Sequence, residues 1–536
     1  MLLKVKSLRV YLLSMVLAFT AVISGWSPVV SAAETADFNQ LNPSQIVFEM
    51  GAGWNLGNQL EASTNGTPSE TAWGNPAVTQ ALIQKVKAAG FKTIRIPVSY
   101  LNYIGSAPNY TINSTWLSRV KTVVDYAYNE GLYVIINMHT DGYNSVTGSW
   151  LLVNSSDQTT IRAKYQKAWQ QIANTFVNYD EHLIFESMNE EFDGTFGTPD
   201  TTYYSNLNAY NQIFVDTVRQ TGGNNAARWL LIPGWNTNID YTVGNYGFAL
   251  PTDNYRSSTI PSSEKRIMIS VHYYSPWDFA GEESGTITQW GAAATDTSKK
   301  STWGQEDYLD SQLKSMYDKF VTQGYPVVVG EFGSIDKTAF DSTNNTYRAA
   351  FAKAITATAK KYGSVPVYWD NGHNGQYGFG LFDRSTYAVT QPGIIEAIMG
   401  VMNTSKMKNV TTGLYIDGMG RTANGSNASQ WSGSTSNNQQ WVMEFYGAYY
   451  KIKNAATGLY LDGMGRTASG SICGQWSSST SSNQQWVLEP YGGNYRIKNA
   501  ATGLYLDGGG STTNGSDLKM WSSSTSTNLQ WQFVNP

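Results

Sequence analysis

The sequence predicts a (β/α)8 TIM barrel followed by a smaller, closed all-β domain with threefold internal repetition. Between residues 38 and 402, apolar strand-like runs alternate with amphipathic helical segments. From residue 409 onward, one pattern recurs three times at a period of 45 residues. A chain of 536 residues is expected to form two or three domains. The predicted boundaries are 34–402 for the barrel, 403–408 for a short linker and 409–536 for the repeat domain.

Eight apolar runs are expected to form the strands of the barrel. They are GAGWNLGN (51–58), KTIRIPVSY (92–100), LYVIINMHT (132–140), HLIFESMNE (182–190), RWLLIPGWN (228–236), IMISVHYYS (267–275), YPVVVGEFG (325–333) and VPVYWDNG (365–372). Amphipathic helices are expected between them, for example at 78–90, 116–131, 161–179 and 308–320. The alternative, a doubly wound open sheet, normally carries a glycine-rich turn after its first strand, and this chain lacks one.

The repeat domain contains three copies of one motif. TTGLYIDGMGRTANGS begins at 411, ATGLYLDGMGRTASGS at 456 and ATGLYLDGGGSTTNGS at 501. A tryptophan follows each copy (Trp431, Trp476, Trp521), and a second tryptophan ends each repeat (Trp441, Trp486, Trp531). Short alternating segments between glycine- and asparagine-rich turns predict a closed all-β unit with threefold pseudo-symmetry. The second tryptophan of each repeat is expected to belong to its core.

The N-terminus has the order of features of a secretory signal peptide. Lys4, Lys6 and Arg9 precede an apolar run from Val10 to Ile23, and small residues lead up to Ala33. We therefore expect cleavage near Ala33, a signal peptide at 1–33 and a secreted, extracellular protein. No other stretch approaches the length of a membrane span, so no membrane association is expected after cleavage.

Composition excludes several classes of function. The net charge of -4 gives no support for electrostatic binding of nucleic acid. The content of 13% aromatic and 14% charged residues suits a neutral, hydroxyl-rich ligand better than a charged one. One cysteine, Cys473, excludes an internal disulfide, and the four histidines do not stand at metal-ligand spacing. No metal or other cofactor is therefore expected, and we expect a monomer.

Polar residues gather where the predicted strands end. The carboxyl ends of the strands form the rim that carries the active site in (β/α)8 barrels. The residues at this rim are Asn55, Arg95, His139, Asn189, Glu190, His272, Tyr274, Glu331 and Trp369. One such residue would mean little, but their accumulation around one rim predicts an active site.

Two rim carboxylates match the requirement of glycoside hydrolysis. One carboxyl group protonates the departing glycosidic oxygen, and the other stabilises or attacks the anomeric carbon. Glu190 and Glu331 are the candidates for this pair. Arg95 and Tyr274 are expected to hold one carboxylate ionised, while a less compensated environment keeps the other protonated. Trp369 offers a flat apolar face for a sugar ring, and Asn55 offers an amide for its hydroxyl groups.

The first domain resembles glycoside hydrolase family 5, the cellulase family of retaining (β/α)8 enzymes. The pieces that carry the resemblance are GWNLGN, IRIPVSY, NMH, FESMNE, VHYYSP, VVVGEFG and VYWDNG, in the order of the family. The resemblance implies that Glu190 is the acid/base and Glu331 the nucleophile. It implies further that Arg95 lies beside the nucleophile and that Asn189 binds the sugar 2-hydroxyl. The remaining residues implied to line the site are His139, His272, Tyr274 and Trp369.

This sequence departs from the family pattern after the acid/base. Relatives commonly have proline or valine there, and this chain has Glu191. Strand alternation places Glu186 inside the barrel, about 13 Å below Glu190, where a carboxyl group needs partners. Glu191 has the opposite parity and is expected to be a loop charge.

The repeats resemble the ricin-type β-trefoil of carbohydrate-binding module family 13. The resemblance implies sugar sites built from an aspartate, an aromatic ring and an Asn-Gln pair. Their residues are Asp417, Trp431, Asn438 and Gln439 in the first repeat, Asp462, Trp476, Asn483 and Gln484 in the second, and Asp507, Trp521 and Asn528 in the third. Leu529 replaces the glutamine of the third repeat, which makes that site the weakest candidate.

The sequence thus predicts a secreted retaining endo-β-1,4-glucanase that acts on a plant polysaccharide and carries a binding module. β-Mannan, xyloglucan, lichenan and xylan remain alternative substrates for the same chemistry. A non-catalytic carbohydrate-binding protein and a transglycosylase are two further alternatives. Trp235, Trp277 and Trp290 lie in or beside rim loops, where each is either a platform for sugar rings or a packing residue.

Overall fold

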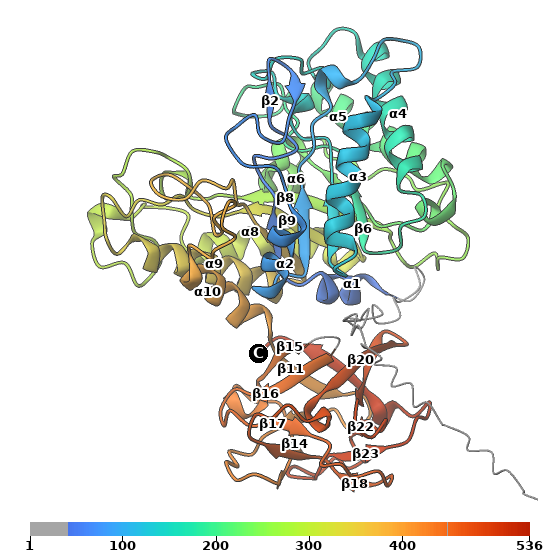
Figure 1. Cartoon of the computed structure of the whole chain (residues 1–536), viewed down its shortest axis with the longest axis vertical. Coiled ribbons are helices and arrows are strands. Elements are labelled where there is room, and N and C mark those ends of the chain that lie inside the picture. The colour runs from blue at the N-terminus through green and yellow to red at the C-terminus, as the bar shows by residue number, and fades with distance from the viewer. Residues whose placement is uncertain (1–40, 447–448) are drawn as a thin grey trace, which may run out of the picture. The chain divides into compact units, whose positions relative to one another are not determined.

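The computed structural model of this 536-residue chain describes residues 41–446 and 449–536 (Figure 1). The signal peptide predicted for residues 1–33 lies outside the described residues. Among the described helices, none has the length and apolar character that crossing a membrane requires.

Eight parallel strands close into a barrel within the described residues, which confirms the predicted fold class. They are β1 (Gly53–Asn55), β4 (Thr93–Ile96), β5 (Tyr133–Ile136), β6 (Leu183–Glu186), β7 (Leu230–Pro233), β8 (Ile267–Tyr273), β9 (Val327–Phe332) and β10 (Ser364–Tyr368). Each overlaps one of the eight predicted runs and follows their order. A separate hairpin, β2 (Ser63–Thr64) and β3 (Thr67–Pro68), follows the first strand.

The helices follow the amphipathic segments. The described α-helices of this domain are α1 (Pro43–Met50), α2 (Gln80–Ala88), α3 (Ser114–Tyr128), α4 (Gln158–Thr175), α5 (Thr201–Gln220), α6 (Ile239–Val243), α7 (Trp277–Ala280), α8 (Glu306–Lys319), α9 (Asn344–Lys361) and α10 (Pro392–Met402). The buried face of α4 contains Ile161, Tyr165 and Trp169, as its spacing predicts. The four helices predicted by range correspond to α2, α3, α4 and α8.

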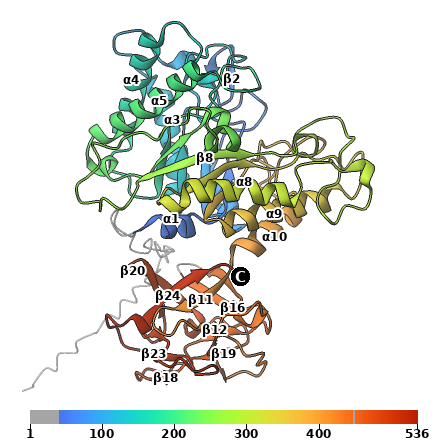
Figure 2. The same ribbon diagram turned by 180° about the vertical axis from the view of Figure 1, so that it is seen from behind.

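Helix α1 closes the end of the barrel opposite the active-site rim, and no pattern in the sequence predicted it. Asn42 and Gln45 form a capping box, and Pro43 occupies the first turn. Ile46 and Met50 are fully buried in one cluster with inward-facing residues of the strands. Both ribbon views place α1 and the hairpin of β2 at opposite ends of the barrel (Figures 1 and 2). The barrel therefore has a packed floor at the end opposite the rim.

The C-terminal domain is a three-repeat all-β unit. Its strands are β11 (Thr404–Asn409), β12 (Tyr415–Asp417), β13 (Ser426–Asn427), β14 (Ser429–Trp431), β15 (Trp441–Tyr446), β16 (Tyr449–Asn454), β17 (Tyr460–Asp462), β18 (Ser471–Ile472), β19 (Gly474–Trp476), β20 (Trp486–Tyr491), β21 (Asn494–Asn499), β22 (Tyr505–Asp507), β23 (Lys519–Trp521) and β24 (Gln530–Val534). The pairings among β11, β15, β16, β20, β21 and β24 close a ring. Trp441, Trp486 and Trp531 are fully buried and fill the core, as predicted.

The structure corrects the predicted linker at 403–408. Helix α10 ends at Met402, and β11 begins at Thr404, so a single residue separates the two elements. Strand β11 pairs with β24, the last strand of the chain, and with β15. The segment TSKMKN alternates buried and half-buried side chains, which is the pattern of a strand with one face in the core. The repeat domain therefore begins at Thr404.

Candidate active site

A buried arginine organises the rim of the barrel. Arg95 lies on β4 and is completely buried, and its guanidinium group donates four hydrogen bonds. Nε donates to Oε2 of Glu186 at 2.7 Å, and Nη1 donates to Oε1 of Glu331 at 2.7 Å. Nη1 also donates to Oδ1 of Asn55 at 3.0 Å, and Nη2 donates to Oδ1 of Asn189 at 2.7 Å. Burial alone lowers the pKa of Arg95, but the two carboxylates outweigh it and raise the pKa.

Glu186 is the interior carboxylate that strand alternation predicted. It is fully buried, and its Oε2 accepts hydrogen bonds from Arg95 and, at 3.0 Å, from Nδ2 of Asn137. Its Oε1 accepts one from the hydroxyl of Ser270 at 2.6 Å. These bonds supply the partners that a buried carboxylate needs. Glu186 therefore anchors Arg95 from below and does not face the cleft.

Asn55 has a different position from the one predicted, because none of its side chain is exposed. Its amide nitrogen donates to the carbonyl oxygens of Gly330 and Tyr368, at 2.8 and 3.2 Å, and its oxygen accepts from Arg95. Both hydrogens and the oxygen of the amide are thus used inside the protein. The expectation that Asn55 contacts a ligand is wrong, and the residue positions Arg95 and ties β1 to β9 and β10.

Glu190 lies four residues beyond the end of β6 and is held by two side chains. Nδ1 of His272 lies 2.6 Å from its Oε1, and the hydroxyl of Tyr143 donates to its Oε2 at 2.7 Å. The same hydroxyl accepts a hydrogen bond from Nδ2 of Asn189 at 2.9 Å. Tyr143 follows the 3-10 turn η2 (Thr140–Gly142) after β5, and it was not predicted from the sequence. No periodicity or strand end marks this tyrosine, so only the fold reveals its place.

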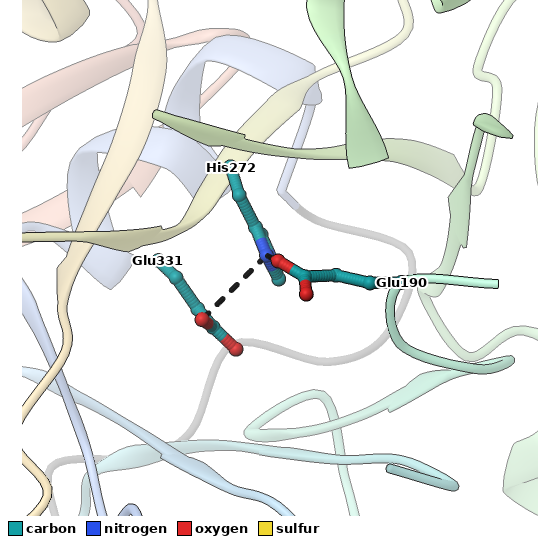
Figure 3. A group of neighbouring side chains, drawn as sticks. All are labelled: Glu190, His272 and Glu331. Carbon is teal, nitrogen blue, oxygen red and sulfur yellow. Dashed lines mark hydrogen bonds and ion pairs between the residues drawn. The ribbon is translucent and has the colours of Figure 1, made fainter. Parts of the chain in front are cut away.

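Glu331 lies on β9 and faces Glu190 across the rim. In addition to Arg95, the hydroxyl of Tyr274 donates to its Oε2 at 3.1 Å. His272 lies between the two glutamates, with Nδ1 3.6 Å from Oε2 of Glu331 (Figure 3). One carboxylate oxygen of each glutamate and one ring nitrogen of His272 all lie within 4.8 Å of one another. The structure thus brings together the two carboxyl groups that the sequence singled out, although 141 positions separate them in the chain.

The two carboxyl groups form a coupled pair. Burial raises the pKa of Glu331, and the charge of Glu190 adds to this effect, so the pKa is raised although His272 and Arg95 oppose it. Burial also raises the pKa of Glu190, but hydrogen bonds from His272 and Tyr143 outweigh it, and the pKa is lowered. Arg95 and Tyr274 are expected to hold one carboxylate ionised, and both contact Glu331. The carboxyl group with the lowered pKa is instead Glu190, because His272 and, to a smaller extent, Tyr143 bond to it.

His139 and Trp369 form one wall of the site. Their rings are nearly parallel, at 6°, with centroids 5.9 Å apart. Asn137 donates to Nδ1 of His139 at 3.2 Å, which leaves the imidazole proton on Nε2. Burial, together with the charges of Arg95 and His272, lowers the pKa of His139 well below its ordinary value. His139 is therefore a neutral donor beside the flat face of Trp369.

Of the three rim tryptophans considered as sugar platforms, only Trp277 is exposed. Trp235 and Trp290 are 1% and 2% exposed and belong to the core. Trp277 is 55% exposed, and its ring meets the edge of Tyr274 at 6.1 Å between centroids. Trp277 thus contacts Tyr274, whose hydroxyl donates to Glu331, and most of its side chain is open to solvent.

Glu191 is buried, which corrects the expectation of a loop charge. It is 1% exposed, and neither of its carboxyl oxygens has a hydrogen-bond partner among the described residues. Burial and the charges of Asp141 and Glu190 raise its pKa well above the ordinary value. The parity of the strand did not predict this burial, because β6 ends at Glu186 and the following segment is irregular.

The trefoil residues divide into buried braces and exposed rings. Asp417, Asp462 and Asp507 are each 6% exposed and accept a backbone hydrogen bond from the residue two positions later. Trp431, Trp476 and Trp521 are 38%, 39% and 41% exposed. The ring of each tryptophan lies against a glycine in the turn of another repeat, namely Gly515, Gly425 and Gly470. Asn438, Asn483 and Asn528 are half-buried, and their carbonyl oxygens accept from Gly418, Gly463 and Gly508.

The glutamines of the trefoil do not face a ligand. Gln439 is fully buried in η7 (Asn437–Gln439), where Nε2 donates to Asp417 and to the carbonyl of Ser432. Gln484, in η8 (Ser482–Gln484), braces its own turn in the same way. Leu529, in η9 (Thr527–Leu529), is equally buried and fills this position with an apolar side chain. The predicted role of Gln439 and Gln484 in sugar contact is therefore corrected to a role in bracing the turn.

Replacing Glu186 by Gln tests whether Arg95 depends on the carboxylate below it. The variant keeps the shape but leaves a buried cation with one ionic partner fewer. We expect the free energy of unfolding to fall by roughly 3 kcal/mol, the lower end for breaking a buried pair, because Glu331 still pairs with Arg95. Ser270→Ala, which removes one hydrogen bond to the same carboxylate, should cost about 1 kcal/mol in the same denaturant titration. Equal losses in the two variants would contradict this account.

The comparisons with known proteins agree with the two-domain fold. The family model of cellulase (glycosyl hydrolase family 5) matches residues 57–375. The model of the ricin-type beta-trefoil lectin domain-like family matches residues 399–476, 437–521 and 482–535. Endoglucanase A of Paenibacillus barcinonensis is 73% identical over 387 residues, which cover 72% of this chain and 96% of that protein.

Solved structures extend the similarity to three dimensions. A family 5 xyloglucanase from Paenibacillus pabuli is 78% identical, with a TM-score of 0.66, and the match covers 66% of this chain and 99% of that one. A broad specificity endoglucanase from Bacteroides salanitronis is 39% identical, with a TM-score of 0.63, over 68% of this chain and 97% of that one. The family model alone spans more than half of the chain. The protein is therefore a glycoside hydrolase that belongs to the cellulase family, glycosyl hydrolase family 5, and carries a C-terminal ricin-type β-trefoil.

Proposed function

We propose that this glycoside hydrolase cleaves internal β-1,4-glucosidic bonds of a plant polysaccharide with retention of configuration. The convergence of Glu190 and Glu331 carries the proposal, because their nearest carboxylate oxygens lie within 4.8 Å. Retaining enzymes hold their two carboxyl groups at about 5 Å, whereas inverting enzymes need roughly 6.5–9.5 Å to admit a water molecule between them. The spacing in this protein leaves room for direct attack on the anomeric carbon.

Glu331 is proposed as the nucleophile. Arg95 and Tyr274 each hold one of its oxygens, so the carboxylate has a fixed orientation at the end of β9. Its attack forms a bond from a carboxylate oxygen to the anomeric carbon while the bond to the leaving glycosidic oxygen breaks. The positive charge of Arg95 stabilises the free carboxylate before attack and after hydrolysis. Only 7% of the Glu331 side chain is exposed, which suits a group that reacts with a bound sugar.

Glu190 is proposed as the acid/base. Its side chain is 25% exposed, against 7% for Glu331, and it is therefore the carboxyl group that water reaches more readily. In the first step Glu190 gives its proton to the leaving oxygen. In the second step it removes a proton from water, whose oxygen attacks the anomeric carbon and releases Glu331. Glu190 regains its proton in this step, so the cycle closes.

One proton on the carboxyl pair defines the active form. A fully ionised pair has no acid, and a doubly protonated pair has no nucleophile, so a bell-shaped pH dependence is expected. Nδ1 of His272 lies 2.6 Å from Oε1 of Glu190 and 3.6 Å from Oε2 of Glu331, so the imidazole bonds to Glu190 and stands beside Glu331. The raised pKa of Glu331 in the free protein then describes the resting state. The proton must be on Glu190 when the glycosidic oxygen leaves, because Glu331 attacks as the carboxylate.

The relatives support a β-1,4-glucan backbone as substrate. Two of them are named endoglucanases, and the relative at 78% identity is named a xyloglucanase. We propose that this enzyme also accepts xyloglucan. Trp369, stacked beside His139, and the exposed Trp277, beside Tyr274, provide apolar faces for sugar rings.

The trefoil is proposed to bind carbohydrate and to keep the barrel near its substrate. The exposed rings of Trp431, Trp476 and Trp521 support this proposal. We further propose that the protein is secreted and monomeric. The charged and apolar order of residues 4–23 supports secretion.

Glu331→Gln and Glu190→Gln each test the catalytic assignment. Each variant should lose activity on polysaccharide by at least about 10³-fold. Glu331→Gln removes the nucleophile, and Glu190→Gln removes the acid of the first step and the base of the second. A 2-fluoro glucoside with a good leaving group should label Glu331 in the wild type, as read by peptide mass spectrometry. Azide should rescue Glu190→Ala on an activated aryl glucoside and give the β-glucosyl azide. Activity of Glu331→Gln near the wild-type level, or a label elsewhere, would refute the assignment.

A substrate panel tests the proposed specificity. Reducing ends and viscosity should be measured with carboxymethyl cellulose, xyloglucan, lichenan, mannan and xylan at equal mass. We expect hydrolysis of the glucans and xyloglucan, with an early fall in viscosity that marks internal cleavage. A preference for mannan or xylan would overturn the glucanase assignment, and absence of reducing ends would favour a binding protein. Products that lengthen as acceptor concentration rises would indicate transglycosylation.

The trefoil sites are tested in the full chain with Glu331→Gln as background. Trp431→Ala and Trp476→Ala should each lower retention on insoluble glucan several-fold, since stacking on one ring contributes about 1 kcal/mol. Trp521→Ala should have the smallest effect, because Lys519 lies directly opposite Asp507 in the third repeat, where Ser429 and Gly474 stand in the others. Equal retention of all three variants and the background would exclude sugar binding through these rings.

A further inference from the structure

Two consecutive glutamates after β6 have opposite environments. Glu190 is half-buried, and both of its oxygens have partners, whereas Glu191 is buried and neither oxygen has one in the described part of the chain. The backbone of Glu191 is fixed, since its carbonyl oxygen accepts from the amide of Asn236 at 3.0 Å. A buried carboxyl group without partners is costly as an anion and much less costly as the neutral acid.

The carboxyl group of Glu191 lies directly against Gly142. A Cβ atom at Gly142 would fall 1.6 Å from Oε2 and 2.0 Å from the carboxyl carbon of Glu191. Gly142 is itself buried and is followed by Tyr143, whose hydroxyl donates to Glu190. The side chain of Glu191 thus fills the space over the turn that carries Tyr143. The turn therefore packs directly against the carboxyl group of Glu191.

No cation faces the carboxyl group of Glu191 among the described residues. The titratable groups around it are Asp141 and Tyr143 from the turn after β5, Glu190 from its own segment, Tyr165 from α4 and Tyr210 from α5. Two cations stand farther out: Lys164 lies over the ring of Trp150 at 4.3 Å and acts on Asp141, and Arg162 donates to Asn206 at 2.9 Å and acts on Tyr210. Asp141 accepts three hydrogen bonds, from the backbone of Tyr100 and Leu101 and from Trp150. An anionic Glu191 would therefore meet negative charge without compensation.

We propose that Glu191 is a neutral carboxylic acid in the folded enzyme and that it positions Tyr143 against Glu190 by packing on Gly142. The inference rests on the proposed role of Glu190 as the acid/base. If Glu191 ionises, the anion must leave its apolar surroundings or separate from Asp141 and Glu190. Either movement displaces the 140–143 turn and removes the hydroxyl of Tyr143 from Glu190. Glu191 therefore acts on catalysis through Tyr143 and does not touch the reacting atoms.

A neutral Glu191 has a defined effect on stability. Its carboxyl ionises in the unfolded chain near the ordinary pKa of 4.5 but stays protonated in the folded protein, where burial raises the pKa. Above that pH the unfolded state binds fewer protons, so this residue destabilises the fold increasingly as the pH rises. The loss stops growing only when the pH passes the folded-state pKa. A glutamine side chain at this position has no ionisable proton, so the Glu191→Gln variant would not show this loss.

Glu191→Gln tests the protonation state by thermal unfolding at pH 4, 6 and 8. We expect the variant and the wild type to unfold at similar temperatures at pH 4. The variant should become more stable than the wild type by a margin that grows toward pH 8, because only the wild type has a carboxyl that ionises on unfolding. A constant difference at all three pH values would overturn the proposal. This measurement needs no activity, so it stands even if Glu190 proves not to be catalytic.

A double-mutant cycle tests the connection to Tyr143. Glu191→Ala and Tyr143→Phe should each lower kcat, by about tenfold, with little change in KM, because both leave Glu190 without the tyrosine hydroxyl. The double variant should lose no more than the larger single loss, and Glu191→Gln should restore most of the kcat that Glu191→Ala loses. Additive losses would show that Glu191 does not act through Tyr143 and would overturn the proposal.

Gly142→Ala provides a second variant if Glu191→Ala does not fold. The added methyl group overlaps the carboxyl of Glu191 and must displace either that side chain or the Tyr143 turn. The expected result is a loss of kcat similar to that of Tyr143→Phe and non-additive with it. Full activity of a folded Gly142→Ala variant would contradict the proposed packing. Loss of activity in Glu190→Gln tests the proposed function separately from the experiments on Glu191, Tyr143 and Gly142.

Discussion

The buried guanidinium of Arg95 is the group on which the rest of the rim depends. A cation with no exposure to solvent must be surrounded by acceptors, and this one has carboxylates below and beside it and two amide oxygens at its flanks. Its planar fork of donors sets the orientation of each of these groups at once. The side chains come from β1, β4, β6 and β9 and from the segment after β6, so the site is complete only in the closed barrel.

Charge balance at the rim follows from the same arrangement. Glu186 and Glu331 together would overcompensate Arg95, and the nearby Glu190 adds a third carboxyl group. Glu190 and Glu331 form a close pair beside His272, and we propose that this pair holds one proton in the active form. Glu191 adds a fourth carboxyl within the same region, and the only inexpensive state for it is the neutral one. Glu190 and Glu191 thus have opposite environments: Glu190 meets His272 and Tyr143, whereas Glu191 packs on Gly142 without a hydrogen-bond partner among the described residues.

The trefoil shows how a symmetric fold tolerates chemical divergence. The three repeats keep the buried tryptophan, the aspartate and the exposed tryptophan, which maintain the shape of the unit. Around them the residues differ: Gln439 and Gln484 brace a turn that Leu529 fills with apolar contact alone. The third repeat keeps the same turn with Leu529 in place of the glutamine, so the fold does not require the hydrogen bonds of that amide. Opposite the aspartate stand Ser429, Gly474 and Lys519, and this position is where the repeats differ in charge.

The sequence by itself determined the fold class, the order of the strands and most of the rim. Buried strands and amphipathic helices leave periodic patterns, and internal repeats are visible by inspection, so the barrel, the trefoil and the pair Glu190 and Glu331 could all be predicted. Strand parity predicted the interior position of Glu186 but not its pairing with Arg95. Helix α1 was not predicted, because it is short and precedes the repeating strand–helix units, so no recurring pattern in the sequence marks it.

Only the tertiary structure decided the roles of residues in irregular segments. Tyr143 reaches Glu190 and Glu191 is buried, and both lie beyond the end of a strand, where alternation no longer applies. Asn55, at the last position of β1, serves Arg95 because the neighbouring strands surround its amide. The same holds for β11, which looked like a linker because its pairing partner β24 lies more than 120 residues away. Local pattern specifies which elements form, whereas burial and pairing depend on what the rest of the chain packs against them. The physical reason is that solvent exposure, and with it protonation, is a property of the assembled neighbourhood and not of the residue's place in the sequence.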